Sequence, residues 1–415
     1  GNRAEQKEDL RQLVGLTAGS DDKALLADIT LRRASMYLAT ADYEQAVKQA
    51  QQATALVATH DNKTLEARAY RIWGRAQWQQ GRANAAKPLL QRALRLATAA
   101  KDVLEQAQNY YDLGQIAFLN NQFSEAQQLL HQAIDLFKVE DDKRNMIRCL
   151  DNLGSIAILS ESNFEAALTY FQDSFRMCQS IHWPYGETYV LYHLGNCYFE
   201  IGDFAQSQET LGKTLTLTRL LGDRAAEANA LDTLGLAYQF DGQLEQARAK
   251  FEEALAIHDS LNDRRGKAYV QTHLGILLSN LEEIEQAGIY LYDALSARSD
   301  SGAKETTIDT EAALAWLDMA RGDSDFAQER AQEIAAWLQE NGTAGVELPF
   351  QVFWQCYTVL KLTGAAEEAQ SLLQLAYTQL MARTQKIQDE DLRAHYLESV
   401  VYHRQIIEAF EATTR

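Results

Sequence analysis

Three arginines in the first quarter of the chain have the spacing of a binding surface. Arg68, Arg71 and Arg75 stand at i, i+3 and i+7, which places them on one stripe of a helix. Guanidinium groups bind carboxylates and phosphates through paired hydrogen bonds, so the stripe is a candidate anchor for such a group or for an acidic peptide. Replacing Arg71 and Arg75 with alanine is then expected to weaken binding without unfolding. The alternative is a solvated helix face whose arginines pair with Glu66 or with neighbouring repeats.

Aromatic residues form a second candidate site near the middle of the chain. Tyr189, Tyr192 and Phe199 follow one another at helical intervals, which favours either a platform for a ligand or packing between adjacent helices. His193 and Cys197 stand at i and i+4, a spacing that suits two metal ligands, but no third ligand is placed nearby. We therefore interpret this pair as structural, and the sequence predicts neither a metal nor a cofactor.

The motifs of common enzymes are absent from the sequence. It contains no phosphate-binding loop, no nucleophile elbow, no zinc-binding His-Glu-x-x-His and no dinucleotide fingerprint after a strand. We therefore expect a protein that is not an enzyme.

Composition narrows the class of partner. The chain has 58 acidic and 39 basic residues, a net charge of −19, which argues against nucleic-acid binding. No uninterrupted apolar stretch of the sequence is long enough to span a membrane. A chain that opens at Gly1 without a methionine is typical of an expression remnant or an excised fragment. The cysteines are scattered without a disulfide framework, which predicts reduced thiols in the cytoplasm: Cys149, Cys178, Cys197 and Cys356.

A repeated pattern organises the whole chain. Its clearest copy reads Leu231-x-x-Leu234-Gly235-x-x-Tyr238, then Gly242, then Ala247-x-x-x-Phe251-x-x-Ala254. The small residue of the first half recurs at Ala34, Gly74, Gly114, Gly154, Gly195, Gly235, Gly275, Ala315 and, in altered form, Tyr357. The small residue of the second half keeps step at Ala46, Ala86, Ala126, Ala167, Ser207, Ala247, Ala287, Ala327 and Ala369. Small residues let two backbones approach and large residues fill the space between them, so each copy predicts a pair of antiparallel helices.

The repeat length and its boundary residues support this interpretation. Successive copies are 40 residues apart, with one extra residue near Ser162 and Asn163. Residues that cap helix N-termini precede the first helices: Asp22, Asn62, Asp102, Asp142, Asp223 and Asp263, with Trp183-Pro184 in their place in the fifth repeat. Turns inside the pairs are predicted at Gly81, Asn121, Gly202, Gly242, Gly322 and Gly364.

With Leu-Gly-x-x-Tyr and Ala-x-x-x-Phe recurring in this way, the chain resembles the long-repeat branch of the tetratricopeptide repeat (TPR) family. That branch includes the adaptor LGN, the maltose activator MalT and the sensor arrays of bacterial STAND signalling ATPases. The tail Tyr396–Arg404 is similar to the ending of many such ATPases, with Val401 where proline is usual. The resemblance implies an all-α, right-handed superhelical solenoid of about nine helical hairpins. We expect a capping helix over residues 1–20, the array over 21–385 and a second capping helix over 386–415.

The resemblance also implies which side chains face the concave groove. In the family these stand six and three positions before the small residue of the first helix, and one and four positions after it. Carried over, they are Arg68, Arg71, Arg75, Trp78, Gln108, Tyr111, Gln115, Arg148, Asp151, Tyr189, Tyr192, Asn196, Phe199, Asn229 and Asp232. Family adaptors often place asparagine directly after the glycine, but here only Asn196 does so, which argues against an LGN-like grip on an extended peptide.

These observations predict a module that binds a protein or peptide partner, including one with acidic or phosphate groups, in the concave groove. Its expected place is the sensor or scaffold part of a bacterial signalling protein. Two alternatives stay open: a small-molecule sensor of the MalT type, and a structural spacer for oligomerisation.

Overall fold

The computed structural model describes residues 8, 12, 20–58, 62–300 and 302–414. Within these ranges every regular element is a helix and there is no β-strand, which confirms the predicted all-α class. The chain forms two compact units, residues 1–156 and 157–415. The helix predicted over residues 1–20 lies almost entirely outside the described residues.

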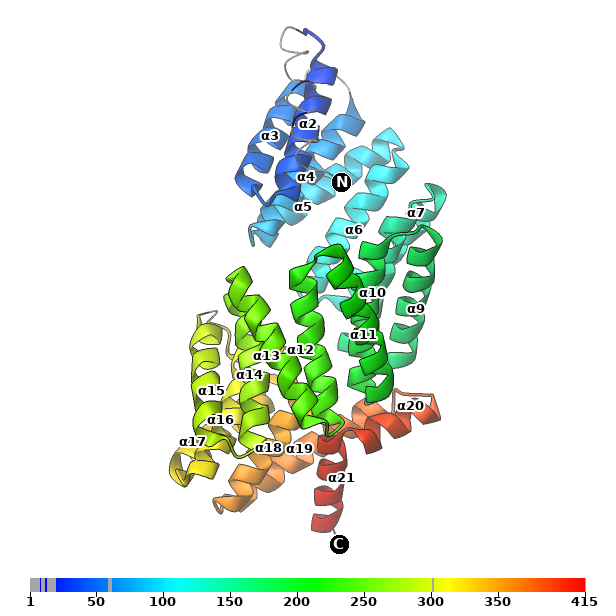
Figure 1. Ribbon diagram of the computed structural model, residues 1–415. Coiled ribbons are helices and arrows are strands. Elements are labelled where there is room, and N and C mark those ends of the chain that lie inside the picture. The colour runs from blue at the N-terminus through cyan, green and yellow to red at the C-terminus, as the bar shows by residue number, and fades with distance from the viewer. Residues whose placement is uncertain (1–7, 9–11, 13–19, 59–61, 301, 415) are drawn as a thin grey trace. The chain divides into compact units, whose positions relative to one another are not determined.

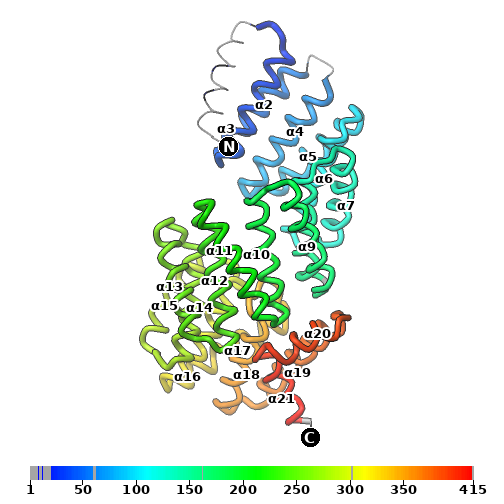
Figure 2. The backbone as a smooth tube through the Cα atoms, turned by 45° about the vertical axis from the view of Figure 1, so that its right-hand side comes forward, coloured from blue at the N-terminus to red at the C-terminus, as the bar shows by residue number. Residues whose placement is uncertain are grey.

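The described part of the first unit consists of three helix pairs and one further helix (Figure 1). Each pair corresponds to one sequence repeat, and its two helices run antiparallel (Figure 2). The helices are α2 (Lys23–Ala39), α3 (Tyr43–Val57), α4 (Lys63–Gln79), α5 (Ala83–Ala100), α6 (Val103–Leu119), α7 (Phe123–Val139) and α8 (Lys143–Ile156).

The second unit continues the same pattern and then leaves it near its end. Its elements are the π-helix η1 (Ala157–Glu161), α9 (Phe164–Ser180), α10 (Pro184–Ile201), α11 (Phe204–Leu221), α12 (Arg224–Phe240), α13 (Leu244–Leu261), α14 (Arg264–Asn280) and α15 (Ile284–Ser299). They are followed by the short 3-10 helix η2 (Lys304–Thr306), α16 (Ile308–Arg321), α17 (Ser324–Asn341), α18 (Pro349–Leu362), α19 (Ala366–Thr384), α20 (Glu390–Ala394), the π-helix η3 (His395–Ser399) and α21 (Val401–Thr414).

The predicted capping residues begin the first helices. Asp22 accepts hydrogen bonds from two backbone N–H groups of α2, and Asn62 accepts one from Leu65 at 3.1 Å. Asp102, Asp142, Asp223 and Asp263 cap α6, α8, α12 and α14 in the same way. Each cap satisfies an N–H group that the helix leaves free, and contributes about 1 kcal/mol. The turns follow the prediction too, with left-handed φ angles of 89° at Gly202 and 57° at Asn121.

The extra residue of the fourth repeat has a structural explanation. Where the other first helices stay regular, α8 passes into the π-helix η1 just before Ser162 and Asn163. A π-turn bonds residue i to i+5 and so takes up one more residue than an α-turn. The inserted residue therefore widens the end of the helix while the following repeats keep their register.

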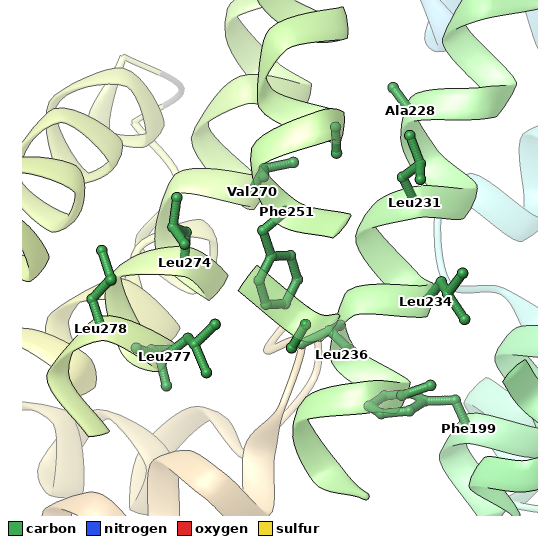
Figure 3. Close-up of a cluster of buried hydrophobic side chains, with 14 of the residues drawn as sticks. Phe199, Ala228, Leu231, Leu234, Leu236, Phe251, Val270, Leu274, Leu277 and Leu278 are labelled. Carbon is green, nitrogen blue, oxygen red and sulfur yellow. The ribbon is translucent and has the colours of Figure 1, made fainter. Parts of the chain in front are cut away.

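Close approach within each pair depends on the small residues identified from the sequence. The backbone at Gly235 faces the ring of Phe251, which is completely buried. Figure 3 shows Phe251 between α12, which carries Leu234 and Leu236, and α14, which carries Leu274. In the fifth repeat, Ser207 replaces alanine and donates a hydrogen bond of 2.9 Å to the carbonyl of Gly195. In the second unit, the fifth to eighth repeats therefore share one apolar core.

Replacing Gly235 with alanine is expected to destabilise the second unit. A Cβ atom there would lie 2.5 Å from Phe251 Cε1, and this ring is completely buried. Overpacking of this kind costs about 1–3 kcal/mol, which exceeds the roughly 1 kcal/mol that alanine gains over glycine inside a helix. Gly212 is the matched control, because it also lies inside a helix but a Cβ atom would meet nothing within 4 Å. Urea unfolding followed by circular dichroism should show lower stability for Gly235→Ala and higher stability for Gly212→Ala; equal effects would contradict the packing argument.

The C-terminal segment does more than cover the last repeat. Phe410 stacks on Tyr377 of α19 with ring centroids 3.9 Å apart, as expected of a cap. However, Tyr396 also packs against Phe164 of α9, with centroids 5.6 Å apart. The carboxylate of Glu165 in α9 accepts hydrogen bonds from the backbone N–H groups that precede α20. The segment therefore connects the first and last repeats of the second unit.

Candidate functional site

A cavity in the first unit brings together five of the predicted binding residues. Its volume is about 370 Å³, and its walls come from α2, α4, α6 and α8, the first helices of four consecutive repeats, together with one residue of α7. We call it the arginine cavity. Its lining residues are Ser35, Leu38, Ala39, Arg71, Ile72, Arg75, Gln108, Tyr111, Asp112, Phe137, Asn145 and Arg148.

Arg71 forms a buried ion pair at the wall of this cavity. Its Nε lies 2.8 Å from Glu105 Oε2 and its Nη2 lies 3.3 Å from Glu105 Oε1, a two-point contact. Its Nη1 is also 3.7 Å from Asp112 Oδ2. Only 11% of the Arg71 side chain is exposed. Burial opposes the charge, but the two carboxylates outweigh it and raise the pKa of Arg71. Arg71 therefore pairs with the neighbouring repeat, as the alternative interpretation proposed, but it is buried and not solvated. From this geometry we now expect that removing Arg71 destabilises the unit.

The other two arginines of the cavity are held more loosely. Arg75 Nε is 3.9 Å from Asp112 Oδ1, and 28% of its side chain is exposed. Arg148 places its guanidinium carbon 5.0 Å from the ring centre of Tyr111, and its Nη1 is 3.5 Å from Asn145 Oδ1. Burial raises the pKa of Tyr111, so its hydroxyl stays protonated and can donate a hydrogen bond. Arg75, Arg148 and Tyr111 therefore present two positive charges and an aromatic ring to the cavity.

The remaining candidates of the first unit lie elsewhere. Arg68 pairs with Asp28 at 3.0 Å and Trp78 packs on the core around Leu90. Asp151 is buried in α8, and Gln115 is half-buried in α6. None of these four residues lines the arginine cavity in the part of the unit that the structure describes.

The candidates of the second unit have different surroundings. The side chain of Tyr189 is 53% exposed and its ring meets His193 edge-on at 4.6 Å, whereas Phe199 is buried between Phe204 and Phe240. Burial raises the pKa of Tyr192, whose hydroxyl interacts with Asn196 and Thr233. Asn229 is exposed, and Asp232 belongs to a set of charged residues that contains His273, Arg298 and Glu347. Phe199 therefore packs in the core, which agrees with the interpretation that the aromatic residues pack between adjacent helices. Tyr189 is accessible to solvent.

The set around Asp232, the ionic network, was not anticipated from the sequence. Asp232 Oδ1 lies 2.8 Å from His273 Nδ1, and His273 Nε2 lies 3.4 Å from Glu347 Oε1. Glu347 Oε2 is in turn 3.3 Å from Arg298 Nη2. Burial opposes the charge of His273, but the two carboxylates outweigh it and raise its pKa to about 10. Protonated His273 thus bridges two carboxylates.

The segment between α17 and α18 is fixed by this network. Asp309 of α16 accepts hydrogen bonds from the backbone N–H groups of Glu347, at 3.1 Å, and Leu348, at 2.9 Å. Arg298 donates hydrogen bonds of 3.0 Å to the hydroxyl oxygens of Thr272 and Thr310. The network therefore holds an irregular connection against α14 and α16.

Two further properties concern metals and membranes. Among the described residues, no three histidine, cysteine, aspartate or glutamate side chains are arranged to hold a metal ion. Burial lowers the pKa of His193 to about 4 and raises that of the Cys197 thiol, so both are neutral at pH 7. In the part of the chain that the structure describes, no helix has the length and apolar character needed to cross a membrane.

Comparison with known families agrees with the repeat analysis. The family model described as tetratricopeptide repeat matches residues 105–180 and 187–260. These segments contain α7, α8, α9, α11 and α12, together with most of α6, α10 and α13. They are tetratricopeptide repeats, which confirms the predicted family. No curated protein sequence matches the chain.

Solved structures with the same fold are distant in sequence. A Rap protein complexed with competence and sporulation factor is 13% identical, with a TM-score of 0.56, over 94% of this chain and 99% of that one. NprR in complex with its cognate peptide NprX is 13% identical, with a TM-score of 0.53, over 92% of this chain and 97% of that one. A STAND protein with a tetratricopeptide repeat sensor, from Pyrococcus horikoshii, is 15% identical, with a TM-score of 0.53, over 78% of this chain and 54% of that one. At these identities the likeness establishes the fold.

Proposed function

We propose that this chain is a regulatory module that binds a protein or peptide through the first helices of its repeats. The observation that carries the proposal is the arginine cavity, in which side chains from four consecutive first helices converge. Cavities of this size with a few convergent polar groups are common binding sites. The complexes of a Rap protein with competence and sporulation factor and of NprR with its cognate peptide NprX support the proposal, because both proteins share this fold. As in the STAND protein, the natural place of such a module is the sensor of a signalling protein. All four cysteines are buried and none forms a disulfide, which suits the cytoplasm.

The chemistry of the cavity favours an anionic group on the partner. Arg71 is already neutralised by Glu105, whereas Arg75 and Arg148 keep only long or neutral polar contacts. A carboxylate or phosphate between them would gain charge-assisted hydrogen bonds and the hydroxyl of Tyr111. Gln108, whose buried Oε1 has no hydrogen-bond partner among the described residues, adds an acceptor for a backbone N–H. We infer that an acidic or phosphorylated peptide segment is the ligand.

A peptide array tests this proposal. One set of eight-residue peptides carries Asp, Glu or phosphoserine at varied positions, and a matched set carries Asn, Gln or Ser there. The protein should retain the acidic set preferentially. For the peptide that binds most tightly, fluorescence anisotropy should show that Arg75→Ala and Arg148→Ala each weaken binding about 10- to 100-fold, since a hydrogen bond to a charged group contributes roughly 1.5–3 kcal/mol.

Arg92→Ala is the control for this experiment. Arg92 belongs to the same unit and carries the same charge, but it lies over Tyr70 and pairs with Glu66 outside the cavity. It should bind the selected peptide like the unchanged protein. Equal retention of the acidic and neutral sets, or equal weakening by Arg92→Ala, would refute the proposal.

A further inference from the structure

The second unit contains a cavity of a different chemical kind, which we call the amide cavity. Its volume is about 340 Å³. The first helices α12, α14, α16 and α18 form most of its wall, α13 adds one residue, and the C-terminal helix α21 closes it. Its lining residues are Gln239, Phe240, Leu244, Asn280, Trp316, Trp354, Gln355, Val401, Tyr402 and Gln405.

The lining of the amide cavity carries no formal charge, as far as the described residues show. Four of its ten residues are amides and four are aromatic. In a chain in which 23% of residues are charged, this wall differs from the surface and from the arginine cavity. A phosphate or carboxylate in this cavity would lose its water without gaining a counter-charge. The cavity therefore suits an uncharged molecule.

Three glutamines around the cavity have unused hydrogen-bonding capacity. The Oε1 atoms of Gln239, Gln355 and Gln405 are buried and have no hydrogen-bond partner in the described part of the chain. Buried polar atoms are normally paired, and an unpaired acceptor costs free energy. These three belong to separate helices, α12, α18 and α21, and line one cavity. Rotation of the amide groups toward a bound molecule that donates hydrogen bonds would recover this cost.

The aromatic residues supply flat apolar surface beside these amides. Trp316 and Trp354 are half-buried, and the ring of Phe240 meets Tyr402 edge-on at 5.6 Å. Indole rings offer both a broad apolar face and an N–H donor. A ring-shaped ligand can place its face on an indole while its edge reaches the amides, an arrangement that aromatic residues commonly provide for nucleobases.

We propose that the amide cavity binds a small uncharged ring molecule with several O–H or N–H donors at its edge. Nucleosides and neutral sugars both have this chemistry. An extended peptide fits less well, because its successive backbone groups point to opposite sides and do not converge on one point. Since α21 supplies three lining residues, a bound ligand would also tie the C-terminal helix to the repeats. This site is separate from the arginine cavity and does not depend on the function proposed there.

Isothermal titration calorimetry of the full chain tests the proposal. Adenosine and guanosine form one arm, glucose and maltose the other, and adenosine monophosphate and glucose 6-phosphate are the charged counterparts. Saturable binding is expected in one neutral arm, which also identifies the source of the ligand, with at least tenfold weaker binding of its charged counterpart. Absence of saturable binding in both neutral arms, or equal binding of the charged compounds, would overturn the proposal.

Variants at the glutamines separate a binding role from a structural one. Gln355→Leu and Gln405→Leu should each weaken binding of the neutral ligand at least tenfold, while the melting temperature without ligand stays equal or rises, because an unpaired acceptor is removed. Gln49→Leu is the matched control, since Gln49 Oε1 is likewise buried and unpaired among the described residues but lies in the first unit. The control should keep full binding. A fall in melting temperature with unchanged binding in the cavity variants would show that the glutamines are structural and overturn the proposal.

Discussion

Replacing Arg71 with alanine is expected to destabilise the first unit by about 3–5 kcal/mol, the range for removing one partner of a buried ion pair. The change would leave Glu105, which is 9% exposed, and Asp112, which is 2% exposed, without their guanidinium partner. Both carboxylates would then be charged groups in a medium that solvates them poorly. Hydrogen exchange measured by mass spectrometry on the full chain should show faster exchange in α4 and α6, with α12 to α14 unaffected.

Arg92→Ala is again the appropriate control, because the Arg92–Glu66 pair is exposed and such pairs contribute at most about 1 kcal/mol. A double variant, Arg71→Met with Glu105→Leu, should recover part of the lost stability, since it removes the unpaired charge and fills its space with apolar atoms. If Arg71→Ala and Arg92→Ala exchanged alike, the buried pair would have no structural role.

The regular part of this fold was predictable because each repeat states its own helix boundaries. Asp263 caps α14, and Gly235 leaves space for the ring of Phe251. Both features follow from a pattern of residue types within one repeat. The extra residue before Asn163 was also visible in the sequence as a longer step between repeats. The sequence did not predict that this residue would be taken up by a π-helix. Local patterns of this kind are reliable when the same pattern recurs and all levels of structure agree.

The side chains that contact the predicted site residues were harder to predict from the sequence. Glu105 and Asp112 lie one repeat beyond Arg71, so a comparison of charged positions between neighbouring repeats would have found them. The same comparison pairs Asp232 with His273. Glu347 is different, because it lies in an irregular connection, and its contacts depend on a chain path that no repeat pattern specifies.

The amide cavity and the path of the C-terminal segment could not be predicted from the sequence either. Gln388 hydrogen-bonds to Glu165 across 223 positions, and the sequence has no periodic signal at that distance. Tyr402 and Gln405 were assigned to a cap of the last repeat, but they close a cavity formed with Gln239 and Trp316 of earlier repeats. Contacts of this kind depend on the curvature of the stacked repeats, which small rotations per repeat determine.

Raising the pH from 6 to 9 is expected to destabilise the second unit through His273, by on the order of 3 kcal/mol. Its pKa in the folded protein is about 10, above the ordinary value of 6.5, because Asp232 and Glu347 outweigh the effect of burial. The folded state therefore holds a proton that the unfolded state releases. This contribution is complete below about pH 6.5 and is lost progressively as the pH rises toward 10. Urea unfolding of the full chain at both pH values measures it.

His273→Gln should remove this alkaline loss, and it should be less stable than the unchanged protein at pH 6, because Asp232 and Glu347 lose their shared cation. The histidine control has the opposite dependence. Burial lowers the pKa of His193 to about 4, so its contribution is complete above pH 6.5 and is lost as the pH falls. His193→Gln should therefore leave the loss between pH 6 and 9 largely intact. A titration of the His273 ring by NMR with a midpoint near 6.5 would contradict the bridging role, since a histidine between two carboxylates cannot keep the affinity for protons that it has in water.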